Sequence, residues 1–598
     1  MLSLYDYLMI GFYFTFLMSV GFVFRHLNKG GTDFFAGGRR MNWWLLGASS
    51  LVSNFSAWSF TGAASIAYSY GILFFTIFIT DIVGFIVSLL WFAPRFRRLR
   101  LITAMDAVRL RFGRGNEQFF TWLQVITSYF AGAIWLVGLS VIVSAVTPIS
   151  QVTVIMGSGI AIMVLATVGG KWGITANDFV QLVLLISCAV GVTVLTLYHV
   201  GGIGSFISQM PEQHWNMFRP LGTIKYDWLY VGAALIWGIY QKNSIIFGAG
   251  KYIMAKDDKH ARKSVWIPLI GYIILPVFWF VPAVGALIIV PDLMDKYSQF
   301  SNPAEASYIA VCIELLPAGM LGLMVAALFA ATMSSMDTGL NINAGFLVKN
   351  FYEPIFRPKA SEMELQRAGQ VATVLSGSVM VGLAILIVSG GTVSLFDSYL
   401  YLSAYIQAPL TVCLFMGILV RRTPAWSAWL SVLFGISTTI FLYNIVPLPF
   451  MKDLLSPLIG DWMYNYLQTN KFTFTNLLTV PATSIFFFVT RYFYHRSNRS
   501  QSKEAYDASL DEFSSRLDKP VDFESEVGDD NTAQQALTIG TLCMVYGGCV
   551  SVGFLIPNPV SGRLVILGCA LFMFSIGLGL FLYGKRSRRK EGHPSGNL

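Results

Sequence analysis

The sequence predicts an all-α polytopic membrane protein with about 15 transmembrane spans, arranged around an inverted repeat of two five-helix halves. The chain of 598 residues is 55% hydrophobic and 12% charged, with a mean hydropathy of +0.61, whereas a soluble protein of this size needs more polar surface. Its apolar residues fall in blocks of about 20, the length of a helix that crosses a bilayer. Two of these blocks, five spans apart, are interrupted by polar and glycine residues.

The apolar blocks define the spans in order along the chain. The first block is too long for a secretory signal peptide and carries Asp6 ahead of its apolar run, so we expect it to be a span. The predicted spans lie near residues 3–25, 41–70, 72–93, 118–147, 150–169, 174–199, 227–249, 264–291, 318–349, 368–390, 393–420, 425–447, 472–494, 536–556 and 563–584.

Lysine and arginine residues predict the orientation. With the N-terminus outside, the cytoplasmic connections hold 34 of the 41 Lys and Arg residues and the opposite side holds six. This bias predicts a multi-pass protein of the cell (plasma) membrane with a cytoplasmic C-terminus. It also accounts for the net charge of +9, so we expect the lipid bilayer, and no nucleic acid, as the partner of the basic surface.

Spans 2 and 7 have interiors that a lipid-facing helix would avoid. Span 2 contains a polar run over residues 49–59, and span 7 contains Gln241, Lys242 and Asn243 between glycines. Such interruptions free backbone polar groups, which are tolerated at membrane depth only inside protein or beside a cavity. We interpret them as two broken helices at matching positions of an inverted repeat, with helix packing through small residues as the alternative.

Sequence motifs of enzymes and pumps are absent. The six cysteines lie in apolar spans without metal-ligand spacing, and the six histidines form no HExxH-type cluster. The sequence also has no P-loop, dinucleotide fingerprint or nucleophile elbow. We therefore expect neither an enzyme nor an ATP-driven pump, and we assign no catalytic residue.

Span 9 contains a cluster of hydroxyl and carboxylate groups. Helical spacing places Ser334, Asp337 and Thr338 on one face, with Ser335 close to the same side. These hard oxygen ligands suit a small alkali cation, with carbonyl groups of a broken helix completing the site. The alternative is that the hydroxyls bond back to their own helix and that Asp337 lies near a helix end.

Four stretches carry motifs of a known family. They are Ser50–Gly62, the segment RFRR…LITAMDAVRLRFG after span 3, Gly169–Gln181 and Ala330–Thr338. Together they resemble the sodium:solute symporter family, which includes sodium/glucose, sodium/proline and sodium/iodide transporters. The similarity covers roughly residues 1–495, and the first stretch is closest to the proline branch, with Asn54 in place of an aspartate.

The resemblance implies a common sodium site. This site would be formed by the carbonyl oxygens of Val52, Phe55 and Ala331 and the hydroxyls of Ser334 and Ser335. We call this set the first oxygen cluster.

The resemblance also implies a second sodium site, which only some members have. It would be formed by Asp178, Ser334, Asp337 and Thr338, a set that we call the second oxygen cluster. Members with two sites carry hydroxyls where this chain has Asp337. That carboxylate could strengthen cation binding, take a proton or pair with a base, so one or two sodium ions per cycle remain open.

The fold that the resemblance implies is the leucine-transporter type, with ten core helices in two inverted repeats formed by spans 2–11. The polar stretch before the last two spans is typical of a disordered cytoplasmic loop. The predicted regions are 1–40 (an extra span and a cytoplasmic loop), 41–249 (the first part of the core, with both broken helices), 250–422 (the remainder of the core), 423–495 (two peripheral spans), 496–533 (the polar loop) and 534–598 (two C-terminal spans and a basic tail).

A solute would lie between the broken helices near the bilayer midplane. By alignment, the sugar-binding Gln and Glu of the galactose branch fall at Ser59 and Phe78, which argues against a sugar. The candidate substrate contacts are Asn54, Trp58, Ser59, Asp81, Gln241, Lys242 and Asn243.

Lys242 is the least expected of these residues. An unpaired ammonium at membrane depth costs roughly 3 kcal/mol or more, so it requires a partner or water. The sequence leaves three interpretations open, which are an internal ion pair with Asp81 or Asp337, a contact with a substrate carboxylate or hydroxyl, and a misplaced helix boundary.

The function implied by the resemblance is sodium-coupled symport of a small organic solute by alternating access, with Na⁺ as the coupling ion. The solute class stays open among sugars, amino acids and small carboxylates. The alternatives are a transporter-like membrane sensor and a sodium-independent uniporter. We expect a monomer or a loose homo-oligomer.

Overall fold

The fold of this chain is a bundle of membrane-length helices. The computed structural model describes residues 2–25, 40–218, 220, 226–390, 395–494, 501–526, 528 and 531–590. Over these ranges the only β-type pairing is one isolated bridge, between Met41 and Ala255. Eleven of the described helices are long and apolar enough to cross a membrane, and three shorter apolar helices accompany them. The all-α polytopic fold is thereby confirmed, and the number of spans stays a prediction.

Parts of several predictions fall outside the described residues. The loop within region 1–40, the residues at the ends of the polar loop 496–533 and the last residues of the basic tail belong to this group. The same holds for the side chains of residues 169–173, which belong to the third family motif.

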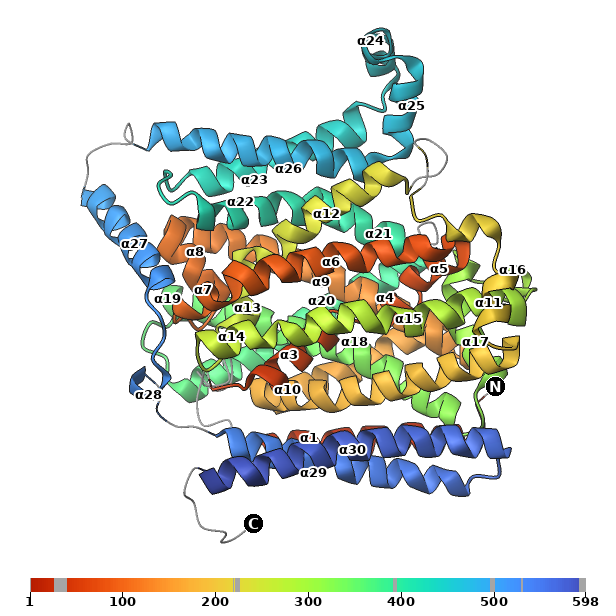
Figure 1. Cartoon of the computed structure of the whole chain (residues 1–598). Coiled ribbons are helices and arrows are strands. Elements are labelled where there is room, and N and C mark those ends of the chain that lie inside the picture. Colours follow the sequence, from red (N-terminus) through yellow and green to blue (C-terminus); the bar gives the residue numbers. More distant parts are fainter. Residues whose placement is uncertain are drawn as a thin grey trace.

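The helix ends define two faces of the molecule, at the left and right of Figure 1. The left face, called here the arginine-rich face, carries short helices with arginines in their last turns. The right face, called here the opposite face, carries the N-terminus and short connecting helices. On the left lie α7 (Ala93–Arg98), α8 (Ala104–Phe112), α14 (Asp258–Ser264) and α27 (Gln501–Asp518), and on the right lie α11 (Ile203–Gln209), α16 (Leu293–Lys296) and α17 (Ser307–Leu315).

One helix forms the centre of the bundle. α18 (Met320–Gly345) is buried along its whole apolar length and packs against helices from distant parts of the sequence. Eleven of its 24 buried residues are Gly, Ala, Ser or Thr, so neighbouring helices approach closely. The long helices that pack on it are α1 (Leu4–Arg25), α9 (Arg114–Val146), α10 (Gln151–Val200) and α20 (Glu362–Gly390), and α15 (Trp266–Ile289) packs on α10.

The predicted break in span 2 is present. α3 (Trp43–Val52) ends before residues 53–56, which are non-helical, and α4 (Ala57–Phe60) and α5 (Gly62–Tyr70) follow. Ser56 is extended, and its side chain accepts a hydrogen bond from the Trp58 N–H, which caps α4.

The predicted break in span 7 is present too, and a serine forms it as well. α12 (Trp228–Asn243) ends at Ser244, which is extended and caps the following π-helix η5 (Ile245–Ala249) by accepting from the Phe247 N–H. A serine whose oxygen satisfies a free N–H group lets each helix restart at membrane depth.

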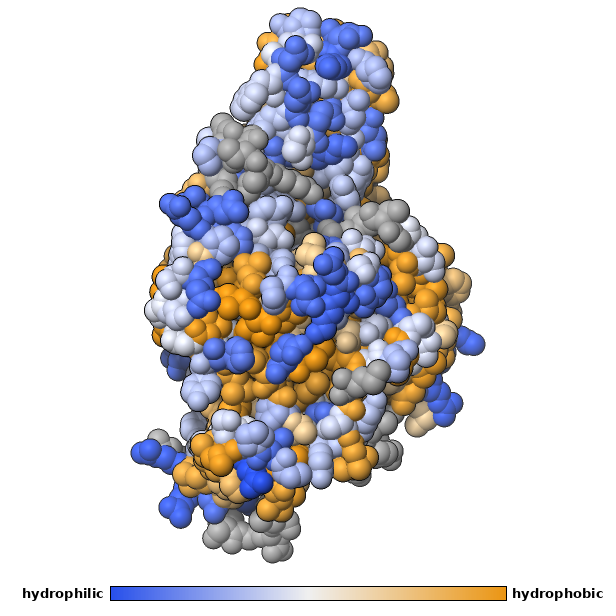
Figure 2. All heavy atoms as spheres, turned by 90° about the vertical axis from the view of Figure 1, so that its right-hand side faces the viewer, coloured by the Kyte–Doolittle hydropathy of each residue, from blue (hydrophilic) through white to orange (hydrophobic). Residues whose placement is uncertain are grey.

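A further group of helices packs on or near α12. α6 (Phe75–Val87), α22 (Ala408–Leu419) and α26 (Lys471–Val489) contact α12, α23 (Ser427–Ile440) packs on α22 and α26, and α21 (Leu395–Leu402) packs on α9. Between α23 and α26 the hairpin of α24 (Pro449–Ile459) and α25 (Asp461–Thr469) projects from the bundle. Figure 2 looks onto the opposite face and shows hydrophilic side chains over this hairpin at the top, with hydrophobic ones abundant on the body below.

Residues 532–590 form a helical hairpin beside α1. α29 (Thr532–Ser551) and α30 (Val560–Lys590) pack tightly along their length because glycines let the backbones meet. A methyl group on Gly540 would lie 2.8 Å from the Gly577 carbonyl oxygen, and one on Gly577 would lie 2.7 Å from the Gly540 carbonyl oxygen. Such close approach is typical of helix pairs in membranes.

Two sequence expectations differ from the structure. Residues 151–200 form one helical element of 50 residues without the loop that the sequence suggested at 169–173. Its apolar parts, Gln151–Thr167 and Ile174–Val200, correspond to the two predicted spans. The expected disorder within 496–533 is wrong for residues 501–518, which form α27. Leu510, Phe513 and Leu517 are buried and recur at helical spacing, so a narrow apolar face packs on α7 and α8 despite the polar composition.

Candidate functional site

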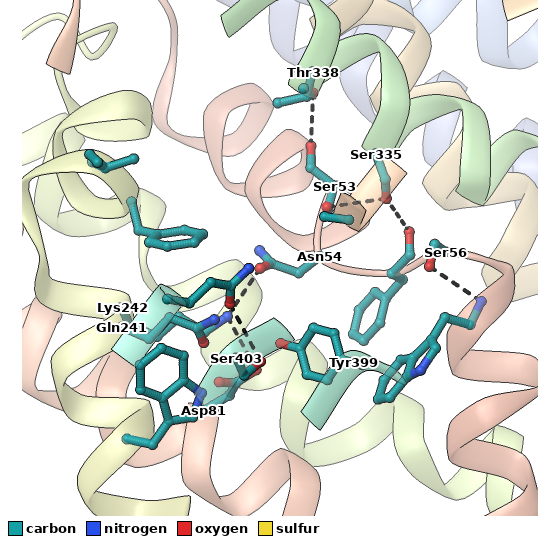
Figure 3. A pocket seen from close by; sticks show the side chains of 18 of the residues that line it. Ser53, Asn54, Ser56, Asp81, Gln241, Lys242, Ser335, Thr338, Tyr399 and Ser403 are labelled. Carbon is teal, nitrogen blue, oxygen red and sulfur yellow. Dashed lines mark hydrogen bonds and ion pairs between the residues drawn. The ribbon is translucent and has the colours of Figure 1, made fainter. Parts of the chain in front are cut away.

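The first oxygen cluster lies where α18 meets the break of span 2. The Ser335 hydroxyl donates toward three carbonyl oxygens, those of Phe55 at 2.8 Å, Ser53 at 3.2 Å and Ala331 at 3.3 Å (Figure 3). The Val52 carbonyl closes the turn of the break by accepting from the Phe55 N–H at 2.9 Å. Carbonyl oxygens of the break and of α18 therefore surround the Ser335 hydroxyl, and Ser335 as a whole residue is 2% exposed.

The second oxygen cluster adjoins the first through Ser334. Asp178 on α10 accepts from the Ser334 hydroxyl with one carboxylate oxygen and from the Ser49 hydroxyl with the other, each at 2.5 Å. The Thr338 hydroxyl lies 3.3 Å from that of Ser53. Asp178 thus ties together α3, α10 and α18.

Asp337 contributes a carboxylate without a complete set of partners. The residue is buried and interacts electrostatically with Asp178, and its Oδ1 atom makes no hydrogen bond with any described residue. A buried carboxylate oxygen without a donor is costly, so this atom is oriented to receive a ligand or a proton. The structure brings all eight predicted cation-site residues into one region around α18.

Ser49 is a residue that sequence reasoning did not single out as a site. It precedes Ser53 by one helical turn, and both serines point from the end of α3 toward α10 and α18. The polar run of span 2 contains several serines, and only the packing of α3 against α10 shows which of them meets Asp178.

A solute-sized cavity lies beside these clusters. Its volume is about 280 Å³, and it is enclosed by the break of span 2 together with α6, α12 and α21. It reaches Tyr399, Ser403 and Gln407, which the sequence did not suggest. Six of the seven predicted substrate contacts line it, namely Asn54, Trp58, Ser59, Asp81, Gln241 and Lys242.

Asn243, the seventh predicted contact, does not line the cavity. Its side-chain amide donates to the carbonyl oxygens of Gly84 at 3.0 Å and Ile239 at 2.9 Å. Asn243 therefore joins α12 to α6 next to the break, and the expectation that it faces the solute is corrected.

Lys242 pairs with Asp81 rather than with Asp337. Its Nζ lies 3.2 Å from an Asp81 carboxylate oxygen and 3.0 Å from the Asn54 Oδ1 (Figure 3). The ammonium also lies over the rings of Phe85 and Tyr272, at 5.3 and 5.6 Å from their centroids. It occupies the last turn of α12, so the predicted helix boundary is close to the observed one.

Asn54 connects the cavity to the oxygen clusters. Its Oδ1 accepts from Lys242, and its Nδ2 donates to the Ser50 carbonyl at 2.5 Å. The same four-residue break supplies the carbonyl groups around Ser335. A group that displaces Lys242 in the cavity therefore acts directly on the backbone that lines the first oxygen cluster.

The side of the cavity toward the opposite face is covered by the start of α21. The Trp58 indole N–H donates to the Leu395 carbonyl at 3.4 Å, and the Trp58 ring stands 5.0 Å from that of Tyr399. Glu305, in the connection before α17, accepts from the Leu395 N–H at 2.8 Å. Burial raises the pKa of the Glu305 carboxyl to about 7, and the hydrogen bond from Leu395 partly offsets that rise.

The side of the cavity toward the arginine-rich face is polar. Gln124 and Ser128 of α9, Asn343 of α18 and Lys251 line it there. Oxygen clusters for an alkali cation, two broken helices and a polar cavity at the middle of the bundle define a cation-coupled secondary transporter.

Comparison with known proteins identifies the family. The model of the sodium:solute symporter family matches residues 34–435, and the chain belongs to this family. The prediction of sodium-coupled symport of a small solute by a multi-pass membrane protein is thereby confirmed.

Similar proteins include two characterised bacterial symporters. The sodium/glucose cotransporter of Vibrio parahaemolyticus is 23% identical over 486 residues, which are 77% of this chain and 89% of that protein. The sodium/sialic acid symporter NanT of Aliivibrio fischeri is 24% identical over 462 residues, which are 74% of this chain and 89% of that protein.

A solved structure shares the fold. The substrate-bound, outward-open structure of a Na⁺-coupled sialic acid symporter superimposes with a TM-score of 0.62 at 20% identity, over 80% of this chain and 98% of that one. The predicted leucine-transporter-type fold is confirmed by this likeness.

Proposed function

We propose that the first oxygen cluster binds the sodium ion that drives uptake of a small organic solute. The observation that carries this proposal is the Ser335 hydroxyl, which touches carbonyl oxygens of both the break and α18. A sodium ion placed among the same oxygens would use the carbonyls of Val52, Phe55 and Ala331 and the lone pairs of Ser334 and Ser335. Binding would lock the break against α18.

The second oxygen cluster would hold a further cation. Asp178 already gathers two hydroxyls, and Asp337 offers a carboxylate oxygen without a donor among the described residues. Because Ser334 belongs to both clusters, occupation of one cluster changes the ligands available to the other. Two sodium ions would then bind cooperatively.

Coupling to solute would pass through Asn54. Sodium fixes the break that carries Asn54, and Asn54 holds Lys242 at the wall of the cavity. Solute affinity then depends on the sodium-bound arrangement, which is the differential affinity that coupled transport requires. Alternating access would exchange the cover at α21 for a closure on the arginine-rich side.

The arginine-rich face would be cytoplasmic and the N-terminus outside. The concentration of lysine and arginine on the connections of that face supports this orientation in the plasma membrane. The cavity, covered toward the opposite face and polar toward the arginine-rich face, corresponds to an inward-facing arrangement. We assign no catalytic activity to the chain and expect a monomer or loose homo-oligomer.

The test is uptake into proteoliposomes under an inward sodium gradient, with choline replacing sodium in the control. We expect accumulation of one class among labelled sugars, amino acids and small carboxylates, only with sodium. Equal uptake in choline would favour the uniporter. Sodium-dependent stabilisation of the protein without uptake of any solute would favour the sensor.

A further inference from the structure

The solute cavity is lined by one carboxylate and two ammonium groups. Asp81, Lys242 and Lys251 are the charged residues among those that line it. Lys251 lies beyond the break toward the arginine-rich face, where its Nζ donates to the Ser53 hydroxyl at 3.0 Å. The wall formed by α6 and α12 therefore presents one charge of each sign.

The pair of Asp81 and Lys242 is accessible from the cavity. The two charged atoms are 3.2 Å apart, and the side chains keep 19% and 10% of their surface exposed. Ion pairs elsewhere in the described ranges lie at helix ends and in connections, as in Lys296–Glu314 at 2.7 Å. A charge pair that served packing alone would be sealed by apolar side chains, whereas this pair borders a space of about 280 Å³.

Lys242 keeps its position without Asp81. Asn54 Oδ1 accepts a hydrogen bond from its ammonium, and the rings of Phe85 and Tyr272 lie beneath it. Its stem lies against the backbone of α6, since a methyl group on Gly84 would come within 2.9 Å of the Lys242 Cγ atom. The ammonium can therefore exchange one carboxylate partner for another without moving.

We infer that the solute is a zwitterion of the amino-acid class, which binds from the cavity against Asp81 and Lys242. Its carboxylate pairs with Lys242 and its ammonium pairs with Asp81. This inference rests on the proposed function, because it takes the cavity as the solute site.

Charge balance selects this class over the others. A solute with a single charge would leave either Asp81 or Lys242 buried beside a neutral group, which is unfavourable in a site that excludes water. A neutral polyol would hydrogen-bond to the two groups but would supply no opposite charge to either of them. A zwitterion replaces both partners at once, because an amino acid carries the two groups on one carbon.

The aromatic part of the wall favours an apolar or aromatic side chain on the solute. Trp58, Tyr399 and Trp237 line the cavity around the charge pair. Rings of this kind bury apolar groups and leave their polar edges for orientation.

The first test is ligand-induced stabilisation of the purified full-length protein. The twenty common L-amino acids, galactose and mannitol are compared in sodium chloride and in choline chloride, followed by the decarboxylated amine and the deaminated acid of the strongest binder. We expect sodium-dependent stabilisation by an amino acid with an apolar side chain, and binding at least about tenfold weaker for both truncated analogues. Stabilisation by galactose or mannitol, with no amino acid active, would overturn the inference.

The second test inverts the selectivity. Asp81→Asn leaves Lys242 as the unopposed charge, so the deaminated acid should bind about tenfold more tightly than to the wild type, while the amino acid weakens. Lys242→Gln should instead favour the decarboxylated amine. The control variants Lys296→Met and Glu314→Gln break an exposed ion pair outside the cavity. They should leave all affinities unchanged.

Different results would contradict the zwitterion inference and the proposed sodium-coupled function. Sodium alone, without solute, should still stabilise the wild type, Asp81→Asn and Lys242→Gln, because all residues of the oxygen clusters are retained. If sodium stabilises all three and neither charge variant changes selectivity, the zwitterion inference is wrong and the sodium site stands. If sodium stabilises none of them and uptake is equal in choline, the proposed function itself is wrong.

Discussion

The oxygen clusters and the solute cavity share the break at residues 53–56 but hold their polar atoms in different ways. Around Ser335 and Asp178, hydroxyl and carbonyl groups are buried and satisfy one another across three helices. Around Lys242, full charges face an accessible space. The cluster side is suited to one small ion of fixed coordination, and the cavity side is suited to a solute whose chemistry varies between relatives.

The largest effect is expected from removing the Ser335 hydroxyl, which lies at the centre of the first oxygen cluster. Ser335→Ala should raise the sodium concentration for half-maximal uptake by about 10- to 100-fold, since hydrogen bonds and ligand contacts to a charged group are worth about 1.5–3 kcal/mol. Sodium titration of uptake in proteoliposomes measures this.

The control for that substitution is Ser187→Ala, which removes a buried hydroxyl of α10 that donates to the Leu184 carbonyl of its own helix and lies outside both oxygen clusters. Sodium dependence of this control should match the wild type. An unchanged sodium response in Ser335→Ala would show that the cation binds elsewhere.

The cavity side is tested by forcing α6 and α12 apart. A methyl group on Gly238 would lie 2.5 Å from the Thr80 carbonyl oxygen, a contact that only backbone movement relieves. Gly238→Ala should raise the solute KM by about tenfold, at a stability cost of about 1–3 kcal/mol, with little change in sodium dependence.

The matched control lies on the same helix. A methyl group on Gly232 has no atom within 4 Å among the described residues, so Gly232→Ala should leave the solute KM unchanged. Equal effects of the two substitutions would mean that helix propensity, and not the contact of α6 with α12, determines the result.

A substitution in the second oxygen cluster distinguishes coupling to one sodium ion from coupling to two. Asp178→Asn leaves the Ser49 and Ser334 hydroxyls without a charged acceptor, and we expect the Hill coefficient for sodium to fall from about 2 to about 1. Ser49→Ala, which removes one donor and keeps the carboxylate, should produce a smaller change. A Hill coefficient of about 1 in the wild type would contradict a second sodium ion.

The sequence predicts the residues of the oxygen clusters better than those of the solute cavity, for a physical reason. Ser334 and Ser335 follow from helical spacing within one segment, and the polar run of span 2 itself indicates a break. The partner of Lys242 depends on which helices pack together. Gly84 and Gly238 bring α6 against α12 and thereby select Asp81, and no local pattern contains that information.

Two further residues show the same limit. Asn243 follows Lys242 directly, yet it faces away from the cavity because the end of α12 turns it toward the Gly84 carbonyl. Glu305 lies in a polar connection without any motif, and only the tertiary structure places it on the first N–H of α21. The helix α27 was missed because composition averages conceal its three buried apolar residues.

The smallest expected effect concerns the cover of the cavity, where Glu305 holds the start of α21. Because burial raises the pKa of Glu305 to about 7, its carboxyl is protonated at pH 6 and ionised at pH 8. An ionised carboxylate accepts the Leu395 N–H more strongly than the neutral acid, so the cover is held more firmly at pH 8. Uptake should therefore change about two- to threefold between pH 6 and pH 8, and Glu305→Gln should remove this dependence.

Stability provides a second readout of the same group, with its own sign. The pKa of Glu305 rises from 4.5 to about 7 on folding, so the unfolded chain loses its proton first and stability falls as pH increases through this interval. The melting temperature of Glu305→Gln should therefore decline less than that of the wild type from pH 5 to pH 8. Parallel declines, together with an unchanged pH profile of uptake, would show that Glu305 neither titrates in this range nor holds α21, and would leave the Trp58–Tyr399 contact as the cover.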